Sequence, residues 1–517
     1  MRALNVLLAV LVSCVIALGV LELGFRLIPA FAPQATVNHP DPTLGWSKEP
    51  GKSITRRVDH EKIHFEINEH GLRDDPGVGP GKEPNTFRVL MLGDSFVLGY
   101  TVERRDLFVD MLEGWWKSED RRIDVVNAGT EGWSTDQEVA WFLAQAEAYD
   151  PDLVLIFPYE NDLYWNGQAS YYGTPKPRFE PSGVFEAKPL PPSTKKKLPL
   201  EGSALVRALR LLKPRGTPEF NPEFGVLLDT PPADYAEWVA RTENVLKNLR
   251  DACAVLDARL VMVPIPSKSA VDPEEKAFFE KWEFGMQGRT DWSPDRPVNE
   301  FLALATKLGI ESLDPRAMLV AETKAKGKLY FPGEVEWHFN ALGNEVFATW
   351  LHAELDRRGV FPAEHAPRLA GAIPEHGPGQ QGGVPTWLYV FGTLWLVLGT
   401  AFCFTYPDEP KPRAYLGVGA MLGAVFAIVL GGGKLMADVV PPAWRSWMLL
   451  GLVLLIVGFI AFKLGRRLAT VLELLAAFTK RGHWYLMPLV VVLLTIGSLL
   501  VVAASSPLIA PFIYTLF

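Results

Sequence analysis

The chain has 517 residues, of which 48% are hydrophobic and 21% charged, with a formal net charge of −8. It is too long for one small domain and too apolar for a disordered chain. Residues 386–517 carry nine Lys/Arg and four Asp/Glu, a net of +5, so residues 1–385 carry 42 against 55, or −13. An acidic body argues against a nucleic-acid binder, which needs a basic folded surface. The basic, very apolar tail predicts a membrane protein with a water-soluble domain.

The N-terminal residues 1–30 contain an uncharged run, Ala3–Leu21, that follows Arg2. A run of this length can span a bilayer, and a preceding arginine favours a cytoplasmic N-terminus. We therefore predict a transmembrane anchor. Two processing alternatives stay open, because Leu11–Cys14 resembles a lipobox and Ala30–Ala32 resembles a signal-peptidase site.

A strand–helix alternation follows residues 31–84, which are rich in proline, glycine and charge and predict an irregular lead-in. Short apolar runs are typical of buried parallel strands. The predicted strands are Phe87–Leu92, Ile123–Val126, Asp152–Phe157 and Ala258–Pro266, and the predicted helices are Phe108–Lys117, Thr135–Tyr149 and Tyr235–Leu256. This order predicts a three-layer α/β/α sandwich with a parallel sheet over residues 85–365.

Residues 163–218 interrupt the alternation with many prolines and the run Lys195–Lys197. We predict a surface excursion near the functional site, with a short amphipathic helix over Ala204–Lys213. The lysine run is typical of a solvated face, with contact to an anionic polymer or lipid as the alternative. Residues 366–385 are rich in glycine and proline and predict a linker into the tail.

The tail, residues 386–517, holds four more uncharged runs of spanning length: Thr386–Tyr406, Ala414–Gly433, Ser446–Phe462 and Trp484–Ala504. Lysines and arginines gather in the first and third loops between these runs, which places those loops in the cytoplasm and the acidic body outside. We therefore predict five spans in a bacterial inner membrane, with a periplasmic or extracellular body. No charge lies centrally in a span, which favours an anchor and docking platform over transport.

Polar motifs follow three of the predicted strands, where ligands bind in parallel sheets. Ser95 follows Gly93-Asp94, where its own amide and a helix N-terminus can serve an oxyanion, although an N-cap serine is the alternative. Asn127-Ala128-Gly129 offers a glycine N–H or a simple turn. Asn161-Asp162 offers a side-chain donor or a helix cap.

A fourth motif, EVEWHFNALG, lies at residues 334–343. His338 is a candidate general base for Ser95, and a nearby carboxylate would hold its tautomer. A lone histidine is more often structural than catalytic. Together with the three strand-end motifs, however, it favours a serine-dependent enzyme.

The order GDSF, NAG, ND and carboxylate–Trp–His–Phe–Asn resembles the SGNH (GDSL-type) hydrolase superfamily, particularly its membrane-anchored bacterial branch that includes alginate O-acetyltransferase-like proteins. The resemblance spans about residues 41–355 and includes DPTLGW at 41–46, NEHGLRDD at 68–75 and GTEGWSTDQE at 129–138. It implies Ser95 as nucleophile and His338 as base. It also implies that the Ser95 amide, the Gly129 amide and the Asn161 side chain form an oxyanion hole, with Asp94 as a structural neighbour.

The sequence departs from the family pattern at two places. Tyr159 stands where the third motif has a glycine, which predicts a narrower pocket. The acidic triad member is usually an aspartate two or three residues before the histidine, but here the three-back position is Val335 and the two-back position is Glu336. Glu336 is therefore the candidate orienter, with Glu334 second. Residues 472–517 also resemble small uncharacterised membrane proteins that accompany such hydrolases in bacterial polysaccharide gene clusters.

We predict a serine acyl-ester hydrolase that faces the cell envelope, acts on acylated polysaccharide or another envelope ester, and needs no cofactor or metal. O-acyl transfer to a sugar hydroxyl is the close alternative, because only the second acceptor differs. A non-catalytic glycan-binding module is the alternative of another class. The expected partners are the ester or carbohydrate substrate, the lipid bilayer and polysaccharide-assembly proteins.

Overall fold

The computed structural model describes residues 36–58, 61–193, 202–211, 220–282, 285–332, 336–367, 386–405 and 410–439, with a few single positions in 15–26 and at 448 and 451. The chain forms two compact units. The sheet unit comprises Ala35–Lys196 and Glu219–Gly379, and the helical unit comprises Met1–Gln34, Lys197–Pro218 and Gln380–Phe517.

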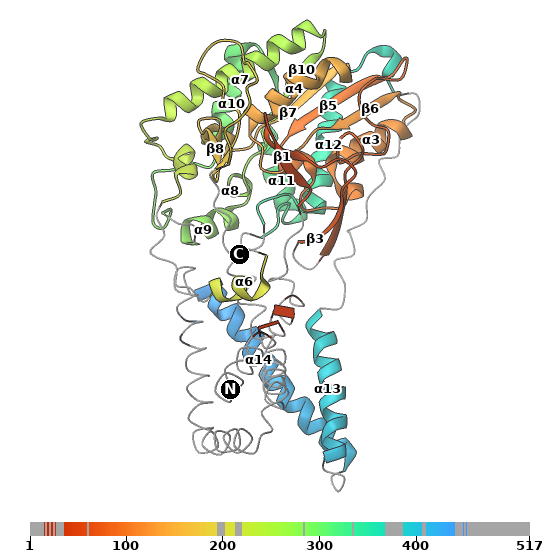
Figure 1. The fold of residues 1–517 in the computed structure, drawn as a ribbon, viewed down its shortest axis with the longest axis vertical. Helices are drawn as coiled ribbons and strands as arrows, with labels where there is room; N and C mark the ends of the chain where they lie inside the picture. The colour runs from red at the N-terminus through yellow and green to blue at the C-terminus, as the bar shows by residue number, and fades with distance from the viewer. Residues whose placement is uncertain are drawn as a thin grey trace, which may run out of the picture. The chain divides into compact units, whose positions relative to one another are not determined.

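The sheet unit is built around a five-stranded parallel sheet with the order β11-β10-β7-β5-β6 (Figure 1). Its strands are β5 (Phe87–Gly93), β6 (Ile123–Asn127), β7 (Leu153–Phe157), β10 (Arg259–Met262) and β11 (Glu311–Ser312). All seven residues of β5 are buried, as expected for a central strand that is covered on both faces. The four predicted strands are confirmed, and the two-residue edge strand β11 is an addition.

Helices cover both faces of this sheet (Figure 1). Alternate strand residues enter two cores, because successive side chains point to opposite faces. One core joins Val89, Met91 and Phe157 to helices α3 (Phe108–Ser118), α11 (Arg316–Lys326) and α12 (Ala341–Arg357). The other joins Leu90, Leu92 and Ile156 to α4 (Thr135–Tyr149), α7 (Tyr235–Val255) and α10 (Arg296–Leu308). The predicted α/β sandwich is therefore confirmed.

The strand order reverses at the centre of the sheet, and this places the site. From β5 the chain adds β6 on one side and then β7 on the other. Ligands in such sheets bind beyond the carboxyl ends of the strands at this switch point. The residues after β5, β6 and β7 therefore meet at one edge. Shorter elements complete the unit: α2 (Ser95–Leu98), η2 (Arg104–Asp106), α5 (Asp162–Trp165), η3 (Pro222–Leu227), α8 (Lys268–Val271), α9 (Pro273–Trp282) and η4 (Ala363–His365).

The lead-in is more regular than predicted. It forms two antiparallel pairs, β1 (Asn38–Asp41) with β2 (Gly45–Lys48) and β3 (Ser53–Val58) with β4 (Glu61–Glu66). A further short pair, β8 (Ser170–Tyr171) with β9 (Thr174–Pro175), lies in the predicted excursion. These strands are short and polar on one face, so their pairing depends on packing against the sheet unit rather than on a long apolar pattern.

The prediction of five membrane-spanning helices is wrong for the described part of the chain, in which no helix is both long and apolar enough to cross a membrane. Two predicted spans fall on α13 (Thr386–Thr405) and α14 (Lys411–Val439). The prediction counted uncharged residues, and some of these are polar and form hydrogen bonds between the two helices. Trp395 Nε1 donates to the Tyr415 carbonyl at 2.7 Å, and the hydroxyls of Thr400 and Tyr415 lie 2.7 Å apart.

The other three predicted spans, in residues 3–21, 446–462 and 484–504, lie almost entirely outside the described residues, as does most of the predicted linker. The membrane location and the lipid and assembly partners stay predictions. The helical unit also contains α6 (Ala204–Leu211), which confirms the predicted short helix. The Glu22 carboxylate accepts hydrogen bonds from the Ala204 and Leu205 amides, both at 3.0 Å, as an anion does at a helix N-terminus.

Candidate active site

Ser95 stands where β5 turns into helix α2. The Asp94 carboxylate accepts a hydrogen bond from the Phe96 amide at 2.8 Å and so caps the helix, while Gly99 ends it in a left-handed conformation. Gly93 is needed for this tight turn, because a Cβ there would lie 2.3 Å from Val97 Cγ2. The turn leaves the Ser95 amide at the start of a helix, where backbone N–H groups have no partner within the helix.

The structure brings His338 and Glu336 to Ser95 from more than 240 residues away. Ser95 Oγ lies 2.7 Å from His338 Nε2, and His338 Nδ1 lies 2.9 Å from Glu336 Oε1. A carboxylate can only accept at Nδ1, so Nδ1 carries the proton and Nε2 accepts from the serine hydroxyl. This is the arrangement in which a serine is activated as a nucleophile.

The Glu336 carboxylate is fixed and kept ionised. Burial works to raise its pKa, but the hydrogen bond and charge of His338, the amide of Trp337 at 2.7 Å and the charge of Lys268 outweigh burial and leave the pKa below its ordinary value. Lys268 Nζ also donates to the Glu336 carbonyl at 3.1 Å. Glu336 thus occupies the position expected of the orienter, whereas Glu334 lies outside the described residues.

Aromatic rings hold the imidazole in place. The His338 ring lies 4.6 Å from the ring of Phe96 and is stacked on Tyr100 at 5.4 Å and 27°. The guanidinium of Arg56 lies 4.0 Å from the centre of the Tyr100 ring, a cation–π contact. Tyr159, the departure at the glycine position, is buried and packs against Phe96 at 4.9 Å, so it belongs to the support of the site.

Two of the predicted oxyanion donors, Asn161 and Gly129, have hydrogen-bond partners within the protein. The Asn161 side chain does not cap α5, and it hydrogen-bonds the buried carboxylate of Glu223, whose pKa burial raises. The Gly129 amide donates to Asn127 Oδ1 at 3.0 Å and is therefore occupied. A Cβ on Gly129 would lie 2.3 Å from the Leu98 amide nitrogen, so this glycine serves close packing of the loop on α2.

Gly132 is a candidate donor that the sequence analysis missed. Residues 130–133 form a turn closed by a 3.2 Å hydrogen bond from the Trp133 amide to the Thr130 carbonyl, with Gly132 at φ 73°. A positive φ at the third position alone defines a type II turn, which requires glycine there. The Glu131 carbonyl accepts from Trp46 Nε1, so the N–H of the same planar peptide, that of Gly132, points the opposite way. In the sequence, the glycine at the third position of Thr-Glu-Gly-Trp (residues 130–133) could have indicated this turn.

A buried acidic cluster supports the loops from beneath. Asp162 accepts from Thr135 Oγ1 at 2.8 Å and from the Tyr159 amide at 3.1 Å, so it ties two strand-end loops together. Burial raises the pKa of Asp94 to about 6, despite the opposing charge of His338. Burial and the charge of Asp162 also raise the pKa of Glu138. The cluster therefore holds protons that exposed carboxyls would release.

A second cluster, away from Ser95, has the donor set of a metal site. Among the described residues, Glu119, His352 and Asp356 place one ligand atom each within 4.8 Å of one another. Arg121, however, contacts both carboxylates at 2.6 Å. A guanidinium at this position supplies the positive charge that a cation would bring, so these residues fit an ion-pair network better than a metal ion.

Comparison with known proteins matches one family model and several solved structures. Residues 468–517 match a family of unknown function (DUF5989), and these residues lie outside the described part of the chain. No curated protein matches the sequence. The structure is similar to a lipase/acylhydrolase from Enterococcus faecalis, with 13% identity, a TM-score of 0.30 and coverage of 53% of this chain and 97% of that chain.

Two further similar structures are a member of the lipolytic protein G-D-S-L family from Veillonella parvula DSM 2008 and an acetyl xylan esterase. The first has 14% identity and a TM-score of 0.29, and covers 53% of this chain and 100% of its own. The second has 12% identity and a TM-score of 0.31, and covers 52% and 100%. These neighbours include the G-D-S-L type that the motifs resemble.

Proposed function

We propose that the protein is a serine-dependent acyl-ester hydrolase of the SGNH type. The observation that carries this proposal is the unbroken hydrogen-bond series from Ser95 Oγ through His338 to Glu336, at the carboxyl end of the central strand. A buried serine paired in this way with an oriented histidine is a rare arrangement for purely structural residues and the usual one for acyl transfer.

The chemistry follows from the geometry. His338 Nε2 takes the proton of Ser95 Oγ as the oxygen attacks the ester carbonyl carbon. The tetrahedral oxyanion accepts hydrogen bonds from the Ser95 amide and from donors on the neighbouring loops, for which Asn161 and Gly132 are the candidates. The ester C–O bond then breaks, and His338 returns the proton to the leaving alcohol. Water repeats the sequence on the acyl-serine and releases the carboxylic acid.

The ionised Glu336 contributes by stabilising the imidazolium that forms in both steps. Because its pKa lies below the ordinary value, it stays charged throughout the neutral range. It needs no proton of its own for this role. The contribution is electrostatic and orientational.

O-acyl transfer is the second candidate function. The observation that favours it is a groove beside the Gly132 turn, where an acceptor could bind. The groove has a volume of about 790 Å³ and includes Gly132 in its lining. A sugar hydroxyl held there could replace water as the second acceptor. Transfer would give an acylated sugar, whereas hydrolysis gives free acid whether or not sugar is present.

The test is ester cleavage by the full chain, with p-nitrophenyl acetate as the substrate. Ser95→Ala and His338→Ala should each lower kcat by about 10⁴-fold or more, because the triad acts as a unit. Ser118→Ala, whose hydroxyl bonds a helix carbonyl at the end of α3, is the matched control and should retain activity. Equal activity of the wild type and both triad variants would overturn the proposal and leave the glycan-binding module in its place.

A further inference from the structure

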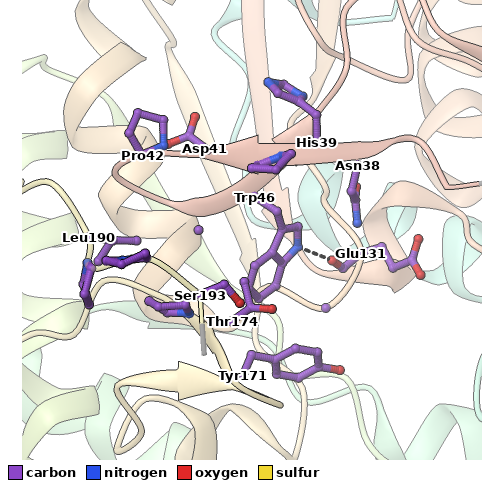
Figure 2. A pocket seen from close by; sticks show the side chains of 16 residues that line it. Asn38, His39, Asp41, Pro42, Trp46, Glu131, Tyr171, Thr174, Leu190 and Ser193 are labelled. Atoms are coloured by element: carbon purple, nitrogen blue, oxygen red, sulfur yellow. Dashed lines mark hydrogen bonds between the residues drawn. The ribbon is translucent and has the colours of Figure 1, made fainter. Parts of the chain in front are cut away.

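The groove beside the site, shown in Figure 2, is formed by segments that the triad does not use. Its walls are the β1–β2 hairpin, the turn at residues 131–132, the β8–β9 hairpin and residues 190–193. The lining residues that matter here combine two aromatic rings with polar groups: Trp46, Tyr171, His39, Asp41, Glu131 and Thr174.

The sequence DPTLGW builds one wall of this groove. Asp41 Oδ1 accepts from the amides of Thr43 and Leu44, both at 2.8 Å, and so folds the hairpin turn. Gly45, at φ 86°, allows the hairpin to approach β9, because a Cβ there would lie 2.3 Å from the Pro175 carbonyl oxygen. The Leu190 amide donates to the Pro42 carbonyl at 2.8 Å and closes the far side. The groove is therefore held by specific contacts.

Two aromatic rings are fixed in the groove. Trp46 Nε1 donates to the Glu131 carbonyl at 2.9 Å (Figure 2). The Trp46 carbonyl accepts from Trp133 Nε1, also at 2.9 Å. The ring of Tyr171 lies 5.4 Å from that of Trp46 at an angle of 40°, and Trp165 supports it from behind at 4.6 Å. Rings locked in this way form a rigid apolar surface and lose little entropy when a ligand binds.

The polar groups around these rings narrow the class of ligand. Asp41, Glu131, His39 and Thr174 interrupt the apolar surface, which does not suit a long acyl chain. Asp41 makes the groove unfavourable for phosphate or uronate groups, and the nearby Arg56 is already paired with Glu131 at 2.9 Å. A ligand with an apolar ring face and a rim of neutral hydroxyls, as in a sugar, matches both features.

The groove adjoins the candidate active site. The Thr130 amide donates to the carbonyl of Gly93, the last residue of β5, at 3.1 Å. The turn that lines the groove therefore starts with a bond to the backbone two residues before Ser95. Glu131 also connects to the base, because its partner Arg56 lies over Tyr100, which stacks on His338. The groove therefore shares a turn and an ion pair with the elements that hold Ser95 and His338.

We propose that this groove binds a neutral sugar ring of an acylated polysaccharide and so presents a neighbouring O-acyl group to Ser95. This deepens the proposed esterase function and rests on it. The half-exposed ring of Tyr171, supported by the buried Trp46, contacts the C–H face of the sugar ring, while the polar rim accepts and donates hydrogen bonds to its hydroxyls. The groove thus determines which esters are substrates, and the triad cleaves them.

The test compares two esters on the full chain: O-acetylated xylotriose, a neutral oligosaccharide, and p-nitrophenyl acetate, which is too small to need the groove. Tyr171→Ala should raise KM for the acetylated trisaccharide about tenfold and leave kcat/KM for p-nitrophenyl acetate within twofold. Tyr171→Phe keeps the ring and should behave as the wild type. Trp350→Ala, at a half-buried aromatic on α12 outside the groove, is the matched control and should not separate the two substrates.

Binding of unacetylated xylotriose to Ser95→Ala, followed by calorimetry, separates the two proposals. Wild-type protein that cleaves neither ester while Ser95→Ala still binds the trisaccharide in a Tyr171-dependent way would overturn the esterase and keep the sugar site. Cleavage of both esters with no effect of Tyr171→Ala on either KM would overturn the sugar site and keep the esterase. An equal loss on both substrates would mean that Tyr171 only supports the fold, and would also overturn the sugar site.

Discussion

The proposed catalytic cluster of Ser95, His338 and Glu336 and the groove share the loop at residues 127–133 but are built differently. Ser95, His338 and Glu336 are joined by hydrogen bonds of 2.7 and 2.9 Å, and each stands in a short contiguous motif at the edge of the sheet. The groove is assembled from hairpins and turns about 15 to 150 residues apart, which meet through isolated hydrogen bonds and ring contacts. Chemistry of this kind leaves a local mark on sequence, whereas the shape of a binding surface does not.

The link between these regions is the loop from Asn127 to Trp133. Its first half packs on α2 behind Ser95, and its second half lines the groove. The difference between the regions therefore predicts separable effects. Changes in the cluster should lower the rate for every ester, changes in the groove should act only on sugar esters, and changes in the connecting loop should affect stability.

The largest expected effect within the cluster, after loss of the nucleophile or base, is that of the orienter. Glu336→Gln removes the charge opposite His338 Nδ1 and permits the wrong tautomer, so kcat should fall about 10³-fold for both esters. Steady-state kinetics on p-nitrophenyl acetate measures this. Glu334→Gln is the matched control and should stay within threefold; a loss at Glu334 with none at Glu336 would assign the role to Glu334.

The next effect is a pH dependence of stability from Asp94. Its folded pKa of about 6 lies above its ordinary value of 3.8, so between these values the folded chain keeps a proton that the unfolded chain has lost. Stability therefore falls as pH rises from 4 to 6. Asp94→Asn removes the titrating carboxyl, and with it this pH dependence, and keeps a side-chain oxygen that can accept from the Phe96 amide.

Urea unfolding of the wild type and Asp94→Asn at pH 4, 5 and 6 measures that difference. The free energy of unfolding of the wild type should fall by about 2 kcal/mol relative to the variant between pH 4 and pH 6, because a pKa shift is worth about 1.36 kcal/mol per unit and its two ends lie partly outside this range. Asp251→Asn, on the exposed side of α7, should follow the wild type. Parallel curves for the wild type and Asp94→Asn would contradict the raised pKa.

A smaller effect tests the connecting loop. Gly129→Ala places a Cβ 2.3 Å from backbone nitrogen of Leu98 and should destabilise the sheet unit by more than about 2 kcal/mol. Gly114→Ala, in the exposed middle of α3 with no atom within 4 Å of the new Cβ, should stabilise it by about 0.5–1 kcal/mol. Thermal unfolding of both variants gives the comparison, and equal shifts would show that Gly129 is not closely packed.

The smallest expected effect tests the path from the groove to the base. Tyr100→Ala removes the ring stacked on His338 and should lower kcat about tenfold with KM unchanged, because the imidazole loses part of its orientation. Tyr100→Phe keeps the ring and should restore kcat to within twofold. A change in KM alone, or no rescue by phenylalanine, would remove Tyr100 from the positioning of the base.

Much of the sheet unit could be predicted from the sequence, because buried parallel strands such as β5 and β7 are continuous apolar runs. The strand β11 could not, since its two residues, Glu311 and Ser312, carry no pattern. The hairpins of the lead-in were also missed, because their strands are short and their partners are chosen by packing. The prediction of membrane spans failed where uncharged residues such as Thr400 and Tyr415 were counted as apolar.

At the site, Ser95, His338 and Glu336 could be predicted as a triad because their motifs are contiguous and ordered, and the structure brings the three side chains together. Gly129 was assigned as an oxyanion donor because it follows a strand, yet its amide is occupied by Asn127. The further candidate, Gly132 three residues later, depends on a left-handed turn that only the geometry reveals. The groove could not be predicted at all, because the contact of Gly45 with Pro175 joins segments 130 residues apart.

The most direct test of the central claim, that Ser95 is an activated nucleophile, is labelling of the full chain with a fluorophosphonate followed by mass spectrometry. We predict a single adduct on Ser95 that is absent from Ser95→Ala and His338→Ala and retained in Tyr171→Ala, since the groove does not activate the serine. Folded protein that carries no adduct on Ser95, or labels equally without His338, would contradict the account.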